Sequence, residues 1–202
     1  MPDRRLPSRR TLAMLGLAGV ALALVCLAVA PLVMPRDYSL VADTVSKTAG
    51  QGVAYGWITK AGFVLVSLAA LAIGAAAWPR WGRLGAAAQV AFAACMVAAA
   101  FFETRSWRVD AAYDPVEHDR HSDASNMAAA AFVVCVILIL RAEAPNPRWR
   151  MRLGVLTILA TAITPILMTF FRNADGAMER GWFLLAFAWW ATTAWRIARP
   201  RA

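Results

Sequence analysis

The sequence lacks the short motifs by which several large enzyme classes are recognised. It contains no GxxxxGK[ST] loop for nucleotide phosphates, no GxSxG nucleophile turn and no HExxH zinc helix. It also lacks the regular arginine ladder of a voltage sensor, and no apolar run carries an acid in its middle, as a proton pump would. Function must therefore be inferred from the architecture and from the polar segments between apolar runs.

Cysteine is equally scarce. Cys26, Cys95 and Cys135 all fall inside apolar runs, and no pair of them shares a loop. They give no information on the redox compartment, and we interpret them as small packing residues.

Long hydrophobic runs are what the sequence has in abundance. Hydrophobic residues make up 60% of the chain and charged residues 16%, and the runs exceed the roughly 11–12 residues of an average globular helix. No run alternates as an outer-membrane strand does, and only helices or closed barrels satisfy all backbone groups in lipid. We predict one all-α membrane domain over residues 1–202, a bundle of six transmembrane helices near Thr11–Met34, Lys60–Trp78, Leu84–Phe102, Ala124–Leu140, Met151–Phe171 and Gly181–Ile197.

The start of the chain resembles an export signal. Ser8-Arg9-Arg10-Thr11-Leu12 is similar to a twin-arginine motif, and Ala28-Val29-Ala30 is similar to a cleavage site. The apolar run is longer than a signal core, however, and Pro31 directly after Ala30 should obstruct a signal peptidase. We therefore predict an uncleaved first helix after a basic cytoplasmic segment, residues 1–10.

The distribution of charge predicts the orientation of the bundle. With both termini cytoplasmic, the inner segments hold 13 of the 21 basic residues and two of the 12 acids, a net +11 (13 − 2). The outer segments hold eight basic residues and ten acids, a net −2 (8 − 10). This bias follows the positive-inside rule, so we predict a multi-pass protein of the plasma (inner) membrane. The net charge of +9 then indicates contact with anionic membrane lipids, with no nucleic-acid partner.

The first outer loop, residues 35–59, carries its own helical pattern. Ser39 is a suitable N-cap, and apolar residues follow it at helical spacing until Gly50, which predicts a short interfacial helix. Asp43, Ser46 and Lys47 lie on its opposite face. That face is expected to point to water, with the mouth of the bundle as the alternative.

The second outer loop, residues 103–123, begins with charged residues at the membrane edge. Glu103 directly follows two phenylalanines, and Arg105, Arg108 and Asp110 come soon after it. Charges at low dielectric are tolerated mainly when they are paired, so we expect a structural ion pair between Glu103 and Arg105, Arg108 or Arg172. Contact with a substrate is the alternative.

The decapeptide DPVEHDRHSD, residues 114–123, contains the only two histidines of the chain. His118 and His121 stand three residues apart, but Pro115 and Ser122 predict a loop that ends at Ser122 as the N-cap of the fourth span. A HxxH without cysteine or a second histidine pair is a weak zinc signal, and we predict neither metal nor cofactor. His121 is expected to be partly buried beside the helix start and His118 to be solvated.

These segments resemble the bacterial multi-pass family catalogued as domain of unknown function 998. The resemblance is carried by the first helix, by Val45-Ser46 with Gly50 close behind, and by an acidic stretch closing on His121 before the fourth span. It covers roughly residues 11–171. Thr48-Ala49-Gly50 and Ser122 stand where the family tends to have Leu-Gly after the serine and glycine after the histidine. The resemblance implies an architecture and no settled activity.

Two classes of function remain open. The favoured one is a protein without enzymatic activity whose outer polar cap binds a lipid, a small ligand or a partner membrane protein. The alternative is a membrane-embedded hydrolase of a lipid-like substrate that uses Ser46, Asp43, Asp110 and His121; it would require Ser46 and His121 to lie within hydrogen-bond reach. The candidate cap residues are Asp43, Ser46, Glu103, Arg105, Arg108, Asp110, His121 and Arg172.

Overall fold

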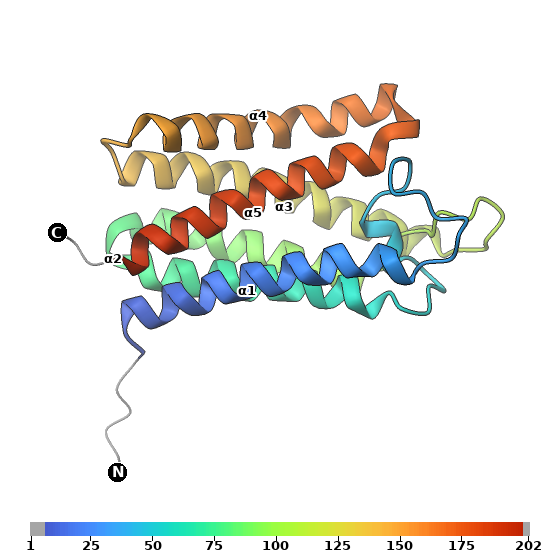
Figure 1. The fold of residues 1–202 in the computed structure, drawn as a ribbon, viewed down its shortest axis with the longest axis horizontal. Coiled ribbons are helices and arrows are strands. Elements are labelled where there is room, and N and C mark those ends of the chain that lie inside the picture. The colour runs from blue at the N-terminus through green and yellow to red at the C-terminus, as the bar shows by residue number, and fades with distance from the viewer. Residues whose placement is uncertain (1–6, 200–202) are drawn as a thin grey trace, which may run out of the picture.

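The computed structural model describes residues 7–199, and all regular structure in this range is helical. Five α-helices form an elongated bundle (Figure 1). Three short 3-10 helices accompany them: η1 (Ala30–Val33), η2 (Ser46–Ala49) and η3 (Arg172–Ala174). The α-helices are α1 (Arg9–Val29), α2 (Trp57–Phe101), α3 (Pro115–Ala142), α4 (Arg148–Phe170) and α5 (Asp175–Ala198).

Helix α2 is folded back on itself. Its 45 residues include Gly82, whose backbone has the left-handed φ of 65° that favours glycine. Gln89 Nε2 donates to the Ala70 carbonyl at 3.2 Å, although 19 residues of straight helix would separate them by about 28 Å. The two arms of α2 therefore run antiparallel, as Figure 1 shows. The arms match the predicted runs Lys60–Trp78 and Leu84–Phe102.

Small residues allow the helices to approach closely. Helix α1 packs along α2 and α5, while α3 lies between α2 and α4. A Cβ on Gly16 of α1 would lie 2.5 Å from the side chain of Ile73, and one on Gly19 would lie 3.0 Å from that of Ala69. Close approach through glycine and alanine is typical of helices that associate in membranes.

Four helical segments of the described chain are long and apolar enough to cross a membrane. They are Arg9–Val33, Trp57–Phe101, Pro115–Ala142 and Arg148–Phe170. The multi-pass, all-helical prediction is thus confirmed at this level. Helix α5 is of similar length but more polar at its start, and it packs against α1 and α4.

The bundle has one end with long connections, which we call the loop end. It carries residues 34–56, residues 102–114 and the short connection from α4 to α5 (Figure 1). The described start of α1 and end of α5 both lie at the opposite end.

The helix that contains the fourth apolar run begins earlier than predicted. Helix α3 starts at Pro115, and Asp114 caps it by accepting from the backbone N–H groups of Val116 and Glu117. Proline at the first helical position is favourable, because its missing N–H would have no partner there. The prediction of a loop ending at Ser122 was therefore wrong. Ser122 lies inside the helix, and its hydroxyl donates to the His118 carbonyl at 3.0 Å.

The predicted interfacial helix of the first loop is also shorter than expected. Only η2 is helical, and it begins at Ser46, seven residues after the proposed N-cap Ser39. The backbone carbonyls before η2 have partners outside a helix. The Val41 carbonyl accepts from the backbone N–H of Ala177 on α5, and the carbonyls of Asp43 and Thr44 accept from the Tyr38 hydroxyl. A backbone held in this way cannot continue as a helix.

A buried ion cluster joins four helices at the opposite end. Glu143 at the end of α3 forms an ion pair with Arg150 of α4 at 3.0 Å and accepts a hydrogen bond from the indole N–H of Trp81 of α2 at 3.0 Å. Arg196 of α5 lies 3.9 Å from the same carboxylate. Arg150 also lies over the ring of Trp189, 4.7 Å from its centroid.

Candidate functional site

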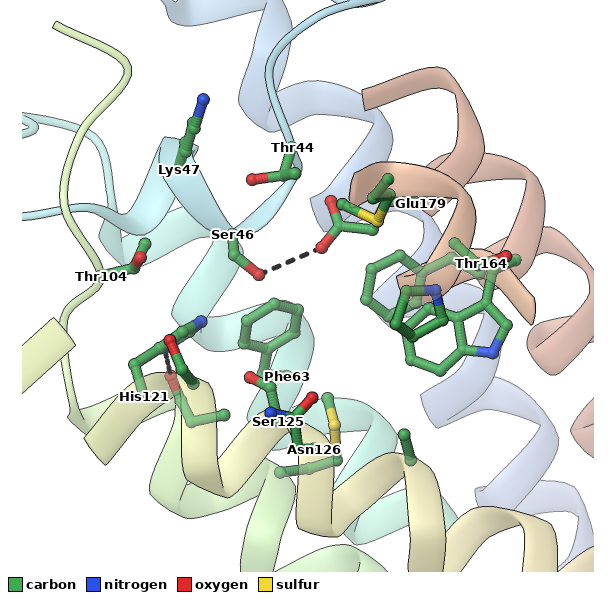
Figure 2. Close-up of a pocket in the computed structure, with 18 of the residues that line it drawn as sticks. Thr44, Ser46, Lys47, Phe63, Thr104, His121, Ser125, Asn126, Thr164 and Glu179 are labelled. Atoms are coloured by element: carbon green, nitrogen blue, oxygen red, sulfur yellow. Dashed lines mark hydrogen bonds between the residues drawn. The ribbon is translucent and has the colours of Figure 1, made fainter. Parts of the chain in front are cut away.

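A cavity of about 390 Å³ lies inside the loop end of the bundle. Its volume falls within the range of small-molecule sites, about 300–1,000 Å³. Its wall combines side chains from both long connections of the loop end with side chains from α2, α3, α4 and α5 (Figure 2). The polar members include Thr44, Ser46, Lys47, Thr104, Arg105, His118, His121, Ser125, Asn126, Thr161, Thr164 and Glu179. The apolar members include Phe63, Met96, Ala129, Pro165, Met168, Trp182 and Phe183.

The cavity reaches the molecular surface between α3 and α4. Asn126 of α3 and Pro165 of α4 both line it, and both are exposed. Arg105, at the rim, is exposed as well. The site is therefore accessible to a ligand from the side of the bundle and from the loops.

The first loop is fastened to the start of α5, and this contact places Ser46 on the wall. Arg180 donates to the carbonyls of Leu40 and Asp43 and to the Tyr38 hydroxyl. Gly176 leaves room for the loop, because a Cβ there would lie 2.2 Å from the Asp43 carbonyl oxygen. Ser46 then faces the cavity, so the expectation that it points to water was wrong. Lys47 contributes to the wall, but its ammonium points away from the cavity and pairs with Asp43 (Figure 2).

Glu179 of α5 is the carboxylate at this contact. It accepts a short hydrogen bond from the backbone N–H of Val45, and the Ser46 hydroxyl donates to its other oxygen at 3.2 Å. Figure 2 shows Ser46 and Glu179 pointing toward one another across the cavity wall. Glu179 precedes the predicted span Gly181–Ile197, and desolvation raises the pKa of its carboxyl to about 7.

Sequence reasoning did not select Glu179. The signal available in the sequence was weak: an acid two residues before an apolar run, beside an arginine. Acids at membrane edges are common, and nothing in the sequence indicated contact with Ser46, 133 residues away.

His121 lies on the α3 side of the cavity. Its Nδ1 is 2.9 Å from the carbonyl oxygens of both Ala99 and Phe102, at the end of α2. Since carbonyl oxygens only accept, Nδ1 carries the proton, and the neutral ring has its lone pair on Nε2. The side chain is buried, more completely than the partial burial predicted, and it supplies a cap to α2.

His118 is half-buried and has partners, which differs from the prediction that it is simply solvated. Its Nδ1 lies 2.9 Å from the Thr104 hydroxyl, and its ring packs edge-on against Tyr113 at a centroid distance of 5.8 Å. The early start of α3 explains the difference, because it places His118 one helical turn before His121, on the same side of the helix.

Other predicted cap residues lie outside the cavity or have different partners. Asp43 pairs with Lys47 at 3.0 Å and accepts from the backbone N–H of Ser39. Glu103 pairs with Lys60, which corrects the predicted arginine partners. The pairing follows from the fold, since both residues lie where the two arms of α2 end side by side.

The remaining candidates are at the surface. Arg108 forms an exposed pair with Asp37 at 3.4 Å. Asp110 is exposed in the second loop, and Arg172 is exposed at the start of η3; neither lines the cavity. Across residues 7–199, no three His, Cys, Asp or Glu side chains come together in an arrangement that could hold a metal ion.

The site thus combines a serine hydroxyl, a carboxylate that changes charge near neutral pH and a neutral imidazole, in a cavity with an aromatic wall. Such a set can bind a polar group, and it can accept a proton from a hydroxyl.

Comparison with known proteins identifies the family. The family described as a protein of unknown function (DUF998) matches residues 17–196. No curated protein and no solved structure matches the chain. The resemblance seen in the sequence is confirmed, and the chain belongs to this family.

Proposed function

We propose that this member of the DUF998 family is a bacterial plasma-membrane protein that crosses the membrane six times and binds an amphiphile at its outer end. Both termini lie in the cytoplasm, α2 supplies two spans, and the part of α5 from Gly181 to Ile197 is the sixth, which leaves Glu179 outside the spans. The loop end then faces outward, and the opening between α3 and α4 meets the outer leaflet of the bilayer.

One observation carries this proposal: the mixed lining of the cavity. Hydroxyl, amide and charged groups come from the loops and from α3, α4 and α5, whereas Phe63 of α2 and Trp182 and Phe183 of α5 give the cavity an aromatic surface. A lipid likewise combines a polar headgroup, which the polar side chains could bind, with an apolar chain, which the aromatic side chains could contact. A purely polar ligand would leave the aromatic surface unused, and a partner subunit could not enter a cavity of this size.

The first test fills the cavity. Ala129→Phe places a large side chain on a residue of the wall, whereas the adjacent Ala130 is exposed and does not line the cavity. Native mass spectrometry of the purified protein with lysophosphatidylglycerol should show one retained lipid per chain. Ala129→Phe should lower the affinity at least about tenfold, equal to 1.4 kcal/mol, and Ala130→Phe should not. Equal binding by both variants would overturn the proposal.

The second test concerns orientation. A reporter active only in the cytoplasm should work when fused after Ala202, and one active only outside should work when inserted near Asn173 in η3. The reverse pattern would refute the six-span topology with cytoplasmic termini.

The predicted hydrolase remains a second candidate function, because Ser46 and His121 line one cavity, although among residues 7–199 no hydrogen bond joins them as that hypothesis required. Its other two proposed members do not support it. Asp43 is held by Lys47 and the loop backbone, and Asp110 lies outside the cavity.

A further inference from the structure

We infer that Ser46 is a nucleophile and Glu179 its general base, and that together they hydrolyse a carboxylic ester of an amphiphile bound in the cavity. This inference rests on the proposed binding function. It replaces the aspartates of the sequence hypothesis with a residue that the sequence did not reveal.

The geometry of the pair is that of an activated nucleophile. The Ser46 hydroxyl donates to Glu179 Oε1 at 3.2 Å, and the backbone N–H of Val45 holds Oε2, which fixes the orientation of the carboxylate. Nucleophile, base and a group that orients the base are three of the parts that this chemistry uses. Both side chains belong to the cavity wall, where a bound ester can reach the serine.

His121 does not take the role of base toward this serine. Among residues 7–199 the hydrogen bond of the Ser46 hydroxyl goes to Glu179, and none joins Ser46 to His121. The proton of His121 is directed toward the end of α2, and its free Nε2 can only accept. His121 therefore offers the cavity a hydrogen-bond acceptor, suited to a hydroxyl or a water molecule.

The environment of Glu179 suits a base that works near neutral pH. Its partly buried position raises its pKa to about 7, and a general base is most effective when its pKa is near the working pH. The cavity residues of α4 carry no charge. The charged or titratable groups around Glu179 and the cavity are Arg180 on its own helix, Tyr38, Asp43 and Lys47 of the first loop, Arg105 of the second, and His118 and His121 of α3.

The reaction consumes one water molecule per ester. Ser46 Oγ attacks the ester carbonyl carbon while its proton passes to Glu179; the bond from carbon to the alcohol oxygen breaks, and the departing alcohol takes the proton from Glu179. Water then attacks the acyl group on Ser46 and gives a proton to Glu179. The bond to Ser46 Oγ breaks, that oxygen recovers the proton, and the free acid leaves.

The test uses a fluorophosphonate with a long alkyl chain. Attack by Ser46 forms an O–P bond, expels fluoride and leaves a stable adduct that intact-mass measurement detects. The full-length protein in detergent should gain one adduct per chain, mapped to Ser46, and should also release 4-nitrophenolate from 4-nitrophenyl decanoate over many turnovers. Ser46→Ala should lose both reactions, and Glu179→Gln, which can still accept from Val45, should slow both by about 10²–10⁴-fold.

Ser39→Ala is the matched control. Ser39 is a serine of the same loop whose hydroxyl accepts from the backbone of Ala42, and it does not line the cavity. Its reaction rates should equal those of the unaltered protein. Should Ser46→Ala fail to fold, the pH profile of labelling in the unaltered protein decides: the rate should rise through about pH 7 and then level off, as expected for Glu179.

The outcomes separate the two proposals. Retention of lysophosphatidylglycerol without adduct or turnover would overturn the hydrolase and leave the binding function intact. An adduct without turnover, an adduct at another residue, a flat pH profile or an unaffected Glu179→Gln would each overturn the assigned chemistry. Failure to bind any single-chain amphiphile, together with failure to react, would overturn both.

Discussion

The ion cluster at the opposite end of the bundle gives the clearest prediction on stability. Glu143 is the only carboxylate in contact with Arg150 among the described ion pairs, and the two side chains are 7% and 0% exposed. Glu143→Ala would leave the guanidinium with one weak hydrogen bond to Thr193, at 3.4 Å, and its position over the Trp189 ring. Breaking a buried pair in this way costs about 3–5 kcal/mol, because the remaining charge is buried without compensation.

Thermal unfolding in detergent measures this cost. The thiol of Cys135 is completely buried, whereas Cys26 and Cys95 are partly exposed. With Cys26 and Cys95 replaced by serine in every variant, a dye that fluoresces on reacting with thiols reports the opening of the bundle. At about 2–4 °C per kcal/mol for a chain of this size, Glu143→Ala should lower the melting temperature by about 6–20 °C. The control is Asp37→Ala, which breaks a pair whose side chains are 53% and 54% exposed and which should leave the melting temperature nearly unchanged.

A double variant tests the cause. Replacing both Glu143 and Arg150 by leucine removes the buried charge together with its partner, so it should destabilise the protein less than Glu143→Ala alone. If Glu143→Ala melts like Asp37→Ala, or if the double variant costs the sum of the two single ones, the buried-charge explanation is refuted.

Three further predictions concern the loop end. Glu103→Ala should cost about 1 kcal/mol or less, because Glu103 and Lys60 are each about one-third exposed; a thermal shift as large as that of a buried pair would contradict this. Desolvation raises the pKa of Glu179 from 4.5 to about 7. Its contribution to the free energy of unfolding should therefore be full below pH 4.5 and should fall by up to about 3 kcal/mol as the pH rises through 7. Urea titrations at several pH values should show this dependence, and Glu179→Gln should flatten it. His121→Ala should cost about 1–3 kcal/mol by leaving carbonyls of α2 unpaired, and His118→Ala, which loses one partly buried bond, should cost less in the same melting assay.

The helices were predictable because membrane-spanning segments must be long and apolar. The six apolar runs predicted most of the length of every α-helix. The arginines at 80 and 83 separate two of these runs, and the bend of α2 lies there. Boundaries were less certain where polar residues continue a helix. The first two turns of α3 are polar, so hydropathy could not reveal them, and the capping role of Asp114 with Pro115 was read as a loop.

The candidate site was predictable only in part. Ser46 and His121 could be selected from short patterns, and both reach the cavity. Their partners could not be selected, because those contacts join residues far apart in the chain, as Ser46 with Glu179 and Glu103 with Lys60 do. Neighbours in sequence, such as Arg105 for Glu103, are the partners that local reasoning favours, and here the fold provided others.

The contact between the first loop and α5 decides whether the cavity keeps its shape, and two glycines of α5 allow it to be tested. A Cβ at Gly176 would meet the carbonyl oxygens of Asp43 and Leu40 at 2.2 and 2.7 Å, whereas a Cβ at Gly181 would meet nothing within 4 Å. Backbone atoms cannot move aside cheaply, so Gly176→Ala should displace the loop that carries Ser46, cost about 1–3 kcal/mol and weaken the retention of lysophosphatidylglycerol. Gly181→Ala, in an open position of the same helix, should bind as the unaltered protein does and melt at the same or a higher temperature, because alanine favours the helix. Equal binding and equal melting of the two variants would show that the cavity does not depend on this contact.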